Sequence, residues 1–284
     1  MADTRQAVDE RQEVLLGEVH GGTLVIGGVP APRLAAEFGT PLYVMDEDRI
    51  RQRCRDYVGA VREHYPNSQV VYASKAFCCM AMCRLAHEEG LYLDVVSPGE
   101  LVTALRAGVP AARLLVHGNN KTPQELQEAL EAGVGRIVLD NFYDVELLDV
   151  LTRETGRTAD VLLRLTPGIE PHTHRAIRTG GVDSKFGFGI LGGTARDAVA
   201  RTLAVPGLRL RGIHCHIGSQ ILDLEPFVQS TEAMVEFAAW MAQDHKVAIE
   251  DLDLGGGPGV RYLPHEQPLE IDEFVAAVTQ VVRR

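Results

Sequence analysis

The sequence offers little that would bind a polyanion or a lipid bilayer. It has 28 lysines and arginines against 39 acidic residues, which gives a net charge of −11 at pH 7. Nucleic acids and anionic membranes require a basic face that neutralises phosphates, so neither is expected as a partner. No apolar run approaches the roughly 18 residues of a membrane span, and the polar, charged stretch Met1–Glu13 is unlike a signal peptide. We therefore expect a cytoplasmic protein that acts on a small molecule.

Cysteine is scarce and is not spaced for zinc. The five cysteines are an odd number and lack the paired spacing of a zinc knuckle. His214 and His216 have the spacing of two metal ligands, but no third ligand stands near them in the sequence. We expect reduced thiols with structural roles and no bound metal. The cysteines are Cys54, Cys78, Cys79, Cys83 and Cys215.

What the chain does contain is a repeated alternation of strands and helices. With 284 residues, 45% of them hydrophobic, it can bury a large core. Short β-branched runs about 20 to 45 residues apart alternate with amphipathic stretches, which favours an α/β fold of the eight-unit TIM barrel type. An open doubly wound sheet is the alternative, because periodicity does not establish closure. The expected strands are Val70–Ala73, Tyr92–Val96, Leu114–His117, Arg136–Leu139, Val161–Leu165, Leu210–His216 and Leu252–Leu254, and the expected helices include Gly99–Ala107, Pro123–Ala132, Asp144–Glu154 and Pro226–Gln243.

The two ends of the chain do not fit this repeat. Residues 1–40 contain the glycine pairs Gly21-Gly22 and Gly27-Gly28 and predict a hairpin or short strand of a separate β-domain, whereas residues 41–284 predict the barrel domain. The last helical stretch, Ile271–Arg284, follows the seventh expected strand, so the barrel lacks its eighth strand and two strand edges need cover. We expect a fragment of a longer polypeptide.

A lysine follows the first expected strand directly. Lys75 would then lie at the C-terminal mouth of the barrel, where catalytic groups of this fold collect. An amine at such a place becomes nucleophilic once desolvation or a neighbouring cation lowers its pKa from about 10.4. A solvated surface lysine is the alternative, and position alone does not decide between them.

A histidine strand and a glycine loop are further candidates. Alternation places His214 and His216 on one face of their strand and Cys215 on the other. An imidazole there can lie against an aromatic cofactor ring, bind a metal, or bond to the backbone in the core. Ser219 offers a hydroxyl and a backbone N–H to an anion, and the run Gly255–Gly257 lets the backbone approach one closely. The glycine run matches neither a P-loop nor a dinucleotide fingerprint.

The connection Pro167–Gly187 is long, polar and rich in glycine. Loops of this length in compact domains usually have a function, so we expect it to contact substrate. Arg164 precedes it, near the end of a strand, and points either into the barrel or outward. An inward Arg164 would need an anionic partner.

Six ordered segments resemble the fold-type III pyridoxal-phosphate enzymes and, within them, the diaminopimelate decarboxylase family. The resemblance runs from about Thr40 to Tyr262. The Gly-Asn-Asn-Lys, His-Thr-His and His-Ile-Gly-Ser-Gln elements are more like the diaminopimelate branch than like ornithine- and arginine-type decarboxylases. The segments are Tyr72-Ala73-Ser74-Lys75-Ala76, Leu93-Asp94-Val95-Val96-Ser97-Pro98-Gly99-Glu100-Leu101, His117-Gly118-Asn119-Asn120-Lys121, His172-Thr173-His174 with Lys185-Phe186-Gly187, His214-Cys215-His216-Ile217-Gly218-Ser219-Gln220, and Asp253-Leu254-Gly255-Gly256-Gly257.

The resemblance implies a site for pyridoxal 5'-phosphate in which Lys75 and His216 are catalytic. Lys75 would hold the cofactor as a Schiff base, and His216 would stack on the pyridine ring. Ser219 and the glycines Gly255, Gly256 and Gly257 would cradle the phosphate. Other matching positions that line the pocket or are further candidates are Asp94, Arg164, Glu100, His214, Asn119, His172 and His174.

The implied activity is decarboxylation of meso-2,6-diaminopimelate to L-lysine and carbon dioxide, the last step of lysine biosynthesis, by a protein that is a homodimer at full length. Alternatives are a decarboxylase of another basic amino acid, an amino-acid racemase on the same barrel, and a non-catalytic carrier of the cofactor. The loop Pro167–Gly187 argues against a carrier, because a carrier has little need of a substrate loop.

The sequence departs from the family in one respect. The family continues with a Glu-Pro-Gly-Arg strand end, whose glutamate pairs with the pyridine nitrogen, and with a β-domain that supplies a cysteine proton donor and substrate-binding residues. None of these appears before Arg284, and Cys215 faces away from the histidines and does not replace the donor. We expect the 284-residue chain alone to be inactive.

Overall fold

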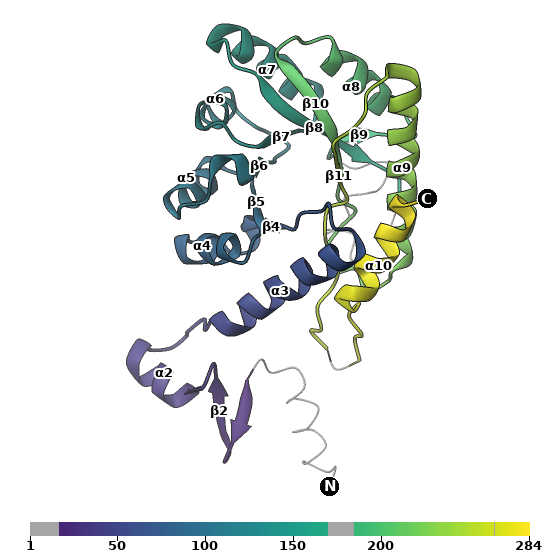
Figure 1. Ribbon diagram of the computed structural model, residues 1–284. Coiled ribbons are helices and arrows are strands. Elements are labelled where there is room, and N and C mark those ends of the chain that lie inside the picture. The colour runs from purple at the N-terminus through teal and green to yellow at the C-terminus, as the bar shows by residue number, and fades with distance from the viewer. Residues whose placement is uncertain (1–16, 170–184, 264) are drawn as a thin grey trace.

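The computed structural model describes residues 17–169, 185–263 and 265–284, with a small N-terminal unit beside a large curled sheet (Figure 1). The N-terminal unit is an antiparallel sheet followed by one helix, which agrees with the predicted hairpin. Gly21 and Gly22 both have positive φ in its first turn, a conformation that glycine adopts without strain. The boundary after residue 40, between a separate β-domain and the barrel domain, stays a prediction. The elements are β1 (Glu18–His20), β2 (Thr23–Ile26), β3 (Val29–Pro30) and α2 (Ala31–Phe38).

The main sheet is a curled wall of parallel strands in the order β11-β10-β8-β7-β6-β5-β4, with β9 beside β8. In the part of the chain that the structure describes, β4 and β11 do not pair with each other, so the wall is an open barrel. This confirms the predicted barrel that lacks a strand. The strands are β4 (Val71–Ala73), β5 (Tyr92–Val95), β6 (Leu114–Val116), β7 (Arg136–Leu139), β8 (Ala159–Thr166), β9 (Phe188–Gly189), β10 (Leu208–Cys215) and β11 (Asp251–Asp253).

Helices cover the outer side of the wall, as Figure 1 shows for α4 to α7. Side chains cap the starts of two of these helices. The Ser97 side chain accepts a hydrogen bond from Glu100 N, and Thr122 forms a capping box with Glu125. The helices are α3 (Glu47–His64), α4 (Met80–Glu88), α5 (Pro98–Arg106), α6 (Pro123–Ala132), α7 (Phe142–Thr155), α8 (Thr194–Leu203), α9 (Glu225–His245) and α10 (Ile271–Val282), and single 3₁₀ turns are η1 (Ser74–Ala76) and η2 (Ala111–Arg113).

The helices α3 and α10, which are far apart in the sequence, lie side by side (Figure 1). His64 Nε2 lies 2.8 Å from Asp272 Oδ1, and the Arg283 guanidinium donates to the His64 carbonyl. At the N-terminal ends of the strands, Arg136 Nε lies 2.6 Å from Asp251 Oδ2 and joins β7 to β11. Among the described residues, no helix has both the length and the apolar character needed to cross a membrane.

Strand alternation separates two apolar layers. Side chains such as Leu93, Ile137 and Leu163 point outward and form the large core between sheet and helices. Leu115, Val138 and Leu162 point inward and form a small apolar floor inside the curled sheet. The next inward positions, two residues further along each strand, therefore lie above this floor, toward the C-terminal mouth.

Candidate active site

Polar and charged side chains occupy those inward positions above the floor. Asp94 lies two residues beyond Tyr92, and the other members follow their strands in the same register. Most of them are buried, so each needs a partner of opposite charge or a hydrogen bond. The members are Asp94, His117, Asp140, Arg164, His214 and Asp253, and we call them the polar ring.

Lys75 lies at the mouth of the barrel on the turn η1, directly after β4. The turn is anchored from below, because the buried Ser74 hydroxyl donates to the Asp94 carbonyl at 2.7 Å. Glu100 Oε2 lies 3.1 Å from Ser74 Oγ and accepts a hydrogen bond from Val96 N at 2.6 Å. The Lys75 side chain itself is exposed to the opening. Glu100 and Ser74 thus fix the backbone that presents the amine.

His216 follows the end of β10 and shares the mouth with Lys75. Burial, together with the charges of His214 and Lys75, lowers the pKa of His216 from 6.5 to about 3. The imidazole is therefore neutral near pH 7 and is suited to lie against an aromatic ring. Cys215 points to the other face, as predicted, where its thiol contacts the Leu254 carbonyl and burial raises its pKa to about 12.

The glycine loop after β11 is packed edge to edge against the loop after β10. Gly257 has a φ of +114°, and a Cβ at this position would lie 2.0 Å from the Gly218 carbonyl oxygen. Gly255 has a φ of +68°, and its Cβ would lie 2.3 Å from the Cys215 oxygen. Only glycine permits this approach. Ile221 N donates to Gly257 O at 3.0 Å and holds the two loops together.

Gly256 differs from its two neighbours, because no atom lies within 4 Å of the position of a Cβ there. The loop therefore leaves open space above Gly256, and the exposed Ser219 lies on the facing loop. Backbone close to open space is what a bound phosphate requires. The residues fit the expected pyridoxal phosphate: a glycine cradle, a neutral imidazole and an amine at the mouth.

Arg164 points into the barrel, which resolves the alternative that its sequence position left open. Its Nη1 lies 3.1 Å from Asp140 Oδ1, and Gly187 N donates to Asp140 Oδ2 at 3.2 Å. The Asp140 backbone N–H donates in turn to Asp144 Oδ2 at 2.8 Å, and the buried Lys121 amine lies 2.7 Å from the same oxygen. This network supplies the anionic partner that an inward arginine needs.

Asp140 and Asp144 were not predicted as site residues, and no role was predicted for Asp253, His117 or Lys121, although the last three lie in the motifs given above. The signal for Asp140 was its register, because it follows β7 at the inward position that Asp94 holds on β5. Asn119 is exposed, and its carbonyl accepts a hydrogen bond from Asn141. The predicted candidates His172 and His174, and most of the predicted substrate loop, lie outside the described residues.

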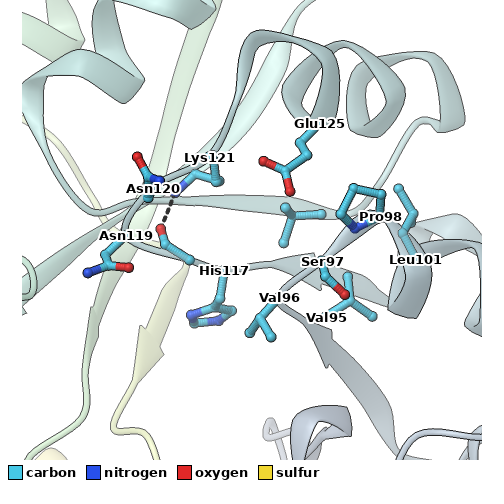
Figure 2. Close-up of a pocket in the computed structure, with 12 residues that line it drawn as sticks. Val95, Val96, Ser97, Pro98, Leu101, His117, Asn119, Asn120, Lys121 and Glu125 are labelled. Atoms are coloured by element: carbon cyan, nitrogen blue, oxygen red, sulfur yellow. Dashed lines mark hydrogen bonds between the residues drawn. The ribbon is translucent and has the colours of Figure 1, made fainter.

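A cavity of about 230 Å³ opens beside the polar ring, between the loops that follow β5 and β6 (Figure 2). Ser97 and Pro98 line one side, and Asn120, Lys121 and Glu125 line the other. His117 borders the cavity, whereas Lys75 and the glycine loop do not. The cavity is thus next to the mouth but separate from the glycine cradle.

Comparison with known proteins agrees with this geometry. Residues 47–284 match the family model for the pyridoxal binding domain of pyridoxal-dependent decarboxylases. Diaminopimelate decarboxylase of Bacillus subtilis is 48% identical over 262 residues, which are 92% of this chain and 60% of the relative. The enzyme of that name from Mycobacterium tuberculosis is 43% identical over 265 residues, 92% of this chain and 59% of the relative. The chain spans about 60% of the length of these curated relatives.

Solved structures give the same result. Diaminopimelate decarboxylase from M. jannaschii in complex with L-lysine superposes with a TM-score of 0.88 at 34% identity, covering 94% of this chain and 62% of that one. The Helicobacter pylori enzyme complexed with L-lysine gives a TM-score of 0.82 at 26% identity, covering 89% and 62%.

Proposed function

Because the chain belongs to the pyridoxal-dependent decarboxylase family, we propose that it is the cofactor-binding part of a carboxy-lyase that converts meso-2,6-diaminopimelate to L-lysine and carbon dioxide. The observation that carries the proposal is the convergence of Lys75, His216 and the glycine loop at one barrel mouth. Similarity to enzymes named diaminopimelate decarboxylase, at 42 to 48% identity, supports the substrate.

We propose the following roles for the site residues. The Lys75 amine would hold pyridoxal phosphate through the aldehyde of the cofactor. His216, neutral because of burial, packs against the pyridine ring. Ser219 and the backbone of Gly255, Gly256 and Gly257 bind the phosphate, while Asp94 and Arg164 line the pocket.

When bound, pyridoxal phosphate supplies an electron sink that takes up the electron pair left by departing carbon dioxide. The chain's own residues orient and hold this group. The glycine cradle and His216 would hold the phosphate and the ring in place, which would fix the orientation of a bound substrate. The Asp140–Arg164 pair keeps a cation fixed inside the barrel without leaving its charge uncompensated. Cys215 takes no part in proton transfer, because its thiol lies on the outer face of the strand and stays protonated.

The test is a substrate comparison with the complete protein reconstituted with pyridoxal phosphate. We expect carbon dioxide release from meso-diaminopimelate, with L-lysine as the product and little release from ornithine, arginine or L-lysine. Release mainly from ornithine or arginine would contradict the substrate assignment. Chiral inversion without carbon dioxide would indicate a racemase, and cofactor binding with neither reaction would indicate a carrier.

We also propose that the complete protein is a cytoplasmic homodimer whose barrel domain begins near residue 41, after an N-terminal part of a β-domain. Large apolar side chains such as Tyr43 and Tyr262 are 100% and 67% exposed, which supports a covering partner surface. Free thiols at all five cysteines suit a reducing compartment. Light scattering should give twice the mass of the complete chain, and a monomer at micromolar concentration would contradict the dimer.

A further inference from the structure

Asp253 connects the glycine loop with the interior of the barrel. Its Oδ1 accepts a hydrogen bond from Gly255 N at 2.8 Å, and its Oδ2 lies 3.0 Å from His214 Nδ1. Burial alone would raise the pKa of Asp253, but His214, His117 and the Gly255 N–H together hold it below its ordinary value. The carboxylate is therefore charged, and it shapes the first residue of the loop proposed to bind phosphate.

His214, which contacts Asp253, also contacts His117 on the other side of the barrel interior. Its ring meets the His117 ring edge to face, with centroids 4.7 Å apart and an interplanar angle of 78°. His214 lies on β10 and His117 follows β6, and β8 and β7 separate these strands in the sheet order. The contact therefore spans the interior and does not run along the wall. Both histidines are buried, with 5% and 7% exposure.

The far end of this line of side chains is Asp94, beside Lys75. His117 Nε2 lies 3.7 Å from Asp94 Oδ1, an oxygen that makes no hydrogen bond within the described residues. The positive charge of Lys75 acts on Asp94, opposing the effects of burial and Asp253 on its pKa. The line thus begins under the glycine loop and ends at Asp94, whose carbonyl accepts a hydrogen bond from Ser74, the residue before Lys75.

Other charges that face the line come from several elements. They are Arg164 from β8, Lys121 from the loop after β6 and Glu100 from α5. Ligand atoms of His117, His214 and Asp253 lie within 4.8 Å of one another, a spacing that a metal ion would also accept. The guanidinium of Arg164 disfavours a further cation in this space, because like charges repel strongly in a buried site.

We propose that His117 and His214 are positioning residues that, with Asp253 and Asp94, form a buried strut between the glycine loop and Lys75. The inference rests on the proposed function, in which the loop binds the phosphate and Lys75 binds the aldehyde of one cofactor. The strut fixes the separation between the two anchors. Rigid spacing of two anchors strengthens a ligand that spans both, and it does little for a ligand that uses one.

Three ligands separate this role from general support of the fold. Pyridoxal phosphate engages both anchors, pyridoxal engages only Lys75, and inorganic phosphate engages only the loop. In the complete protein, we expect His117→Gln and His214→Gln each to weaken pyridoxal phosphate binding by about tenfold or more. The affinities for pyridoxal and for inorganic phosphate should change less than about twofold. His20→Gln, at an exposed histidine outside the barrel, is the matched control.

Several results would overturn the strut. Equal weakening of all three ligands, in variants that still unfold cooperatively, would indicate a general structural role. Unchanged pyridoxal phosphate affinity in both histidine variants would remove the inference but leave the proposed function intact. Stoichiometric zinc in the wild-type protein that is lost in His117→Gln would make the cluster a metal site. Failure of the wild type to bind pyridoxal phosphate through Lys75 would instead refute the proposed function.

If one histidine variant does not fold, the other histidine variant and Asp253→Asn still test the strut. Asp253→Asn should weaken the binding of inorganic phosphate and of pyridoxal phosphate but leave the binding of pyridoxal unchanged.

Discussion

The three consecutive glycines of the loop after β11, Gly255, Gly256 and Gly257, have different structural roles. Gly255 and Gly257 are required by positive φ and by backbone atoms that leave no room for a Cβ, whereas Gly256 faces open space. The sequence shows three identical letters, so it could predict the loop but not this division. The difference between conformational need and ligand space appears only once the two loops are packed together.

Gly256→Ala should therefore affect the cofactor more than the fold. The added methyl group would occupy the space proposed for the phosphate, and we expect pyridoxal phosphate affinity to fall about tenfold, which is about 1.4 kcal/mol. The unfolding free energy in urea should change by less than about 1 kcal/mol. Gly257→Ala is the comparison, since its methyl would meet the Gly218 carbonyl and destabilise the fold itself. Equal loss of stability in both variants would contradict this distinction.

Asp140 neutralises a buried guanidinium, so its removal should be costly. Asp140→Asn leaves Arg164, only 9% exposed, without its hydrogen-bonded anionic partner, and we expect a loss of about 3–5 kcal/mol in urea unfolding. The matched control is Asp149→Asn, which breaks the exposed pair of Asp149 with Arg153 on α7 and should cost less than about 1 kcal/mol. Similar losses in both variants would show that Arg164 does not depend on Asp140.

Among the secondary-structure elements, those with strong local signals were predictable. Each predicted strand is present with its ends shifted by at most two residues, because β-branched runs bounded by turns fix a strand locally. The strand β9 was not predicted, since the two residues Phe188 and Gly189 carry no alternation. Their pairing with β8 arises from tertiary packing. The cross-barrel contact of His117 and His214 was unpredictable for the same reason: it joins strands that are far apart in the sequence.

The capping box at the start of α6 allows a direct test of how much a local interaction contributes to stability. Thr122→Ala removes one half of the capping box with Glu125, so we expect a loss of about 1 kcal/mol in the unfolding free energy. Thr103→Ala, inside the neighbouring helix α5, should change it by less than about 0.5 kcal/mol. Urea denaturation followed by circular dichroism measures both. A loss from Thr103→Ala as large as that from Thr122→Ala would show that capping is not the cause.

For the whole molecule, the buried Asp94 links stability to pH. Burial, reinforced by Asp253, raises the pKa of Asp94 from 3.8 to about 7. The folded protein therefore holds a proton that the unfolded chain releases, and this stabilisation is present at low pH and lost as the pH rises toward 7. The Asp94→Asn variant does not lose this stabilisation, because an asparagine side chain has no proton to release in this pH range. Between pH 5 and pH 8 the cofactor-free variant should gain stability over the wild type, by about 1.4 kcal/mol for each unit of pKa difference crossed. A stability difference that is constant across this range would contradict the raised pKa.

In the proposed function, the barrel opening, the polar ring and the two packed loops present one lysine, Lys75, to one cofactor. Within this chain the alternative attachment sites are few, because Lys121, Lys185 and Lys246 are the lysines besides Lys75. The most direct test is borohydride reduction of the complete protein with pyridoxal phosphate bound, followed by peptide mass mapping. We predict one stable phosphopyridoxyl group, on Lys75, that is absent from Lys75→Ala and unchanged in Lys246→Gln. A label on another lysine, or no label on a protein that decarboxylates meso-diaminopimelate, would contradict the account.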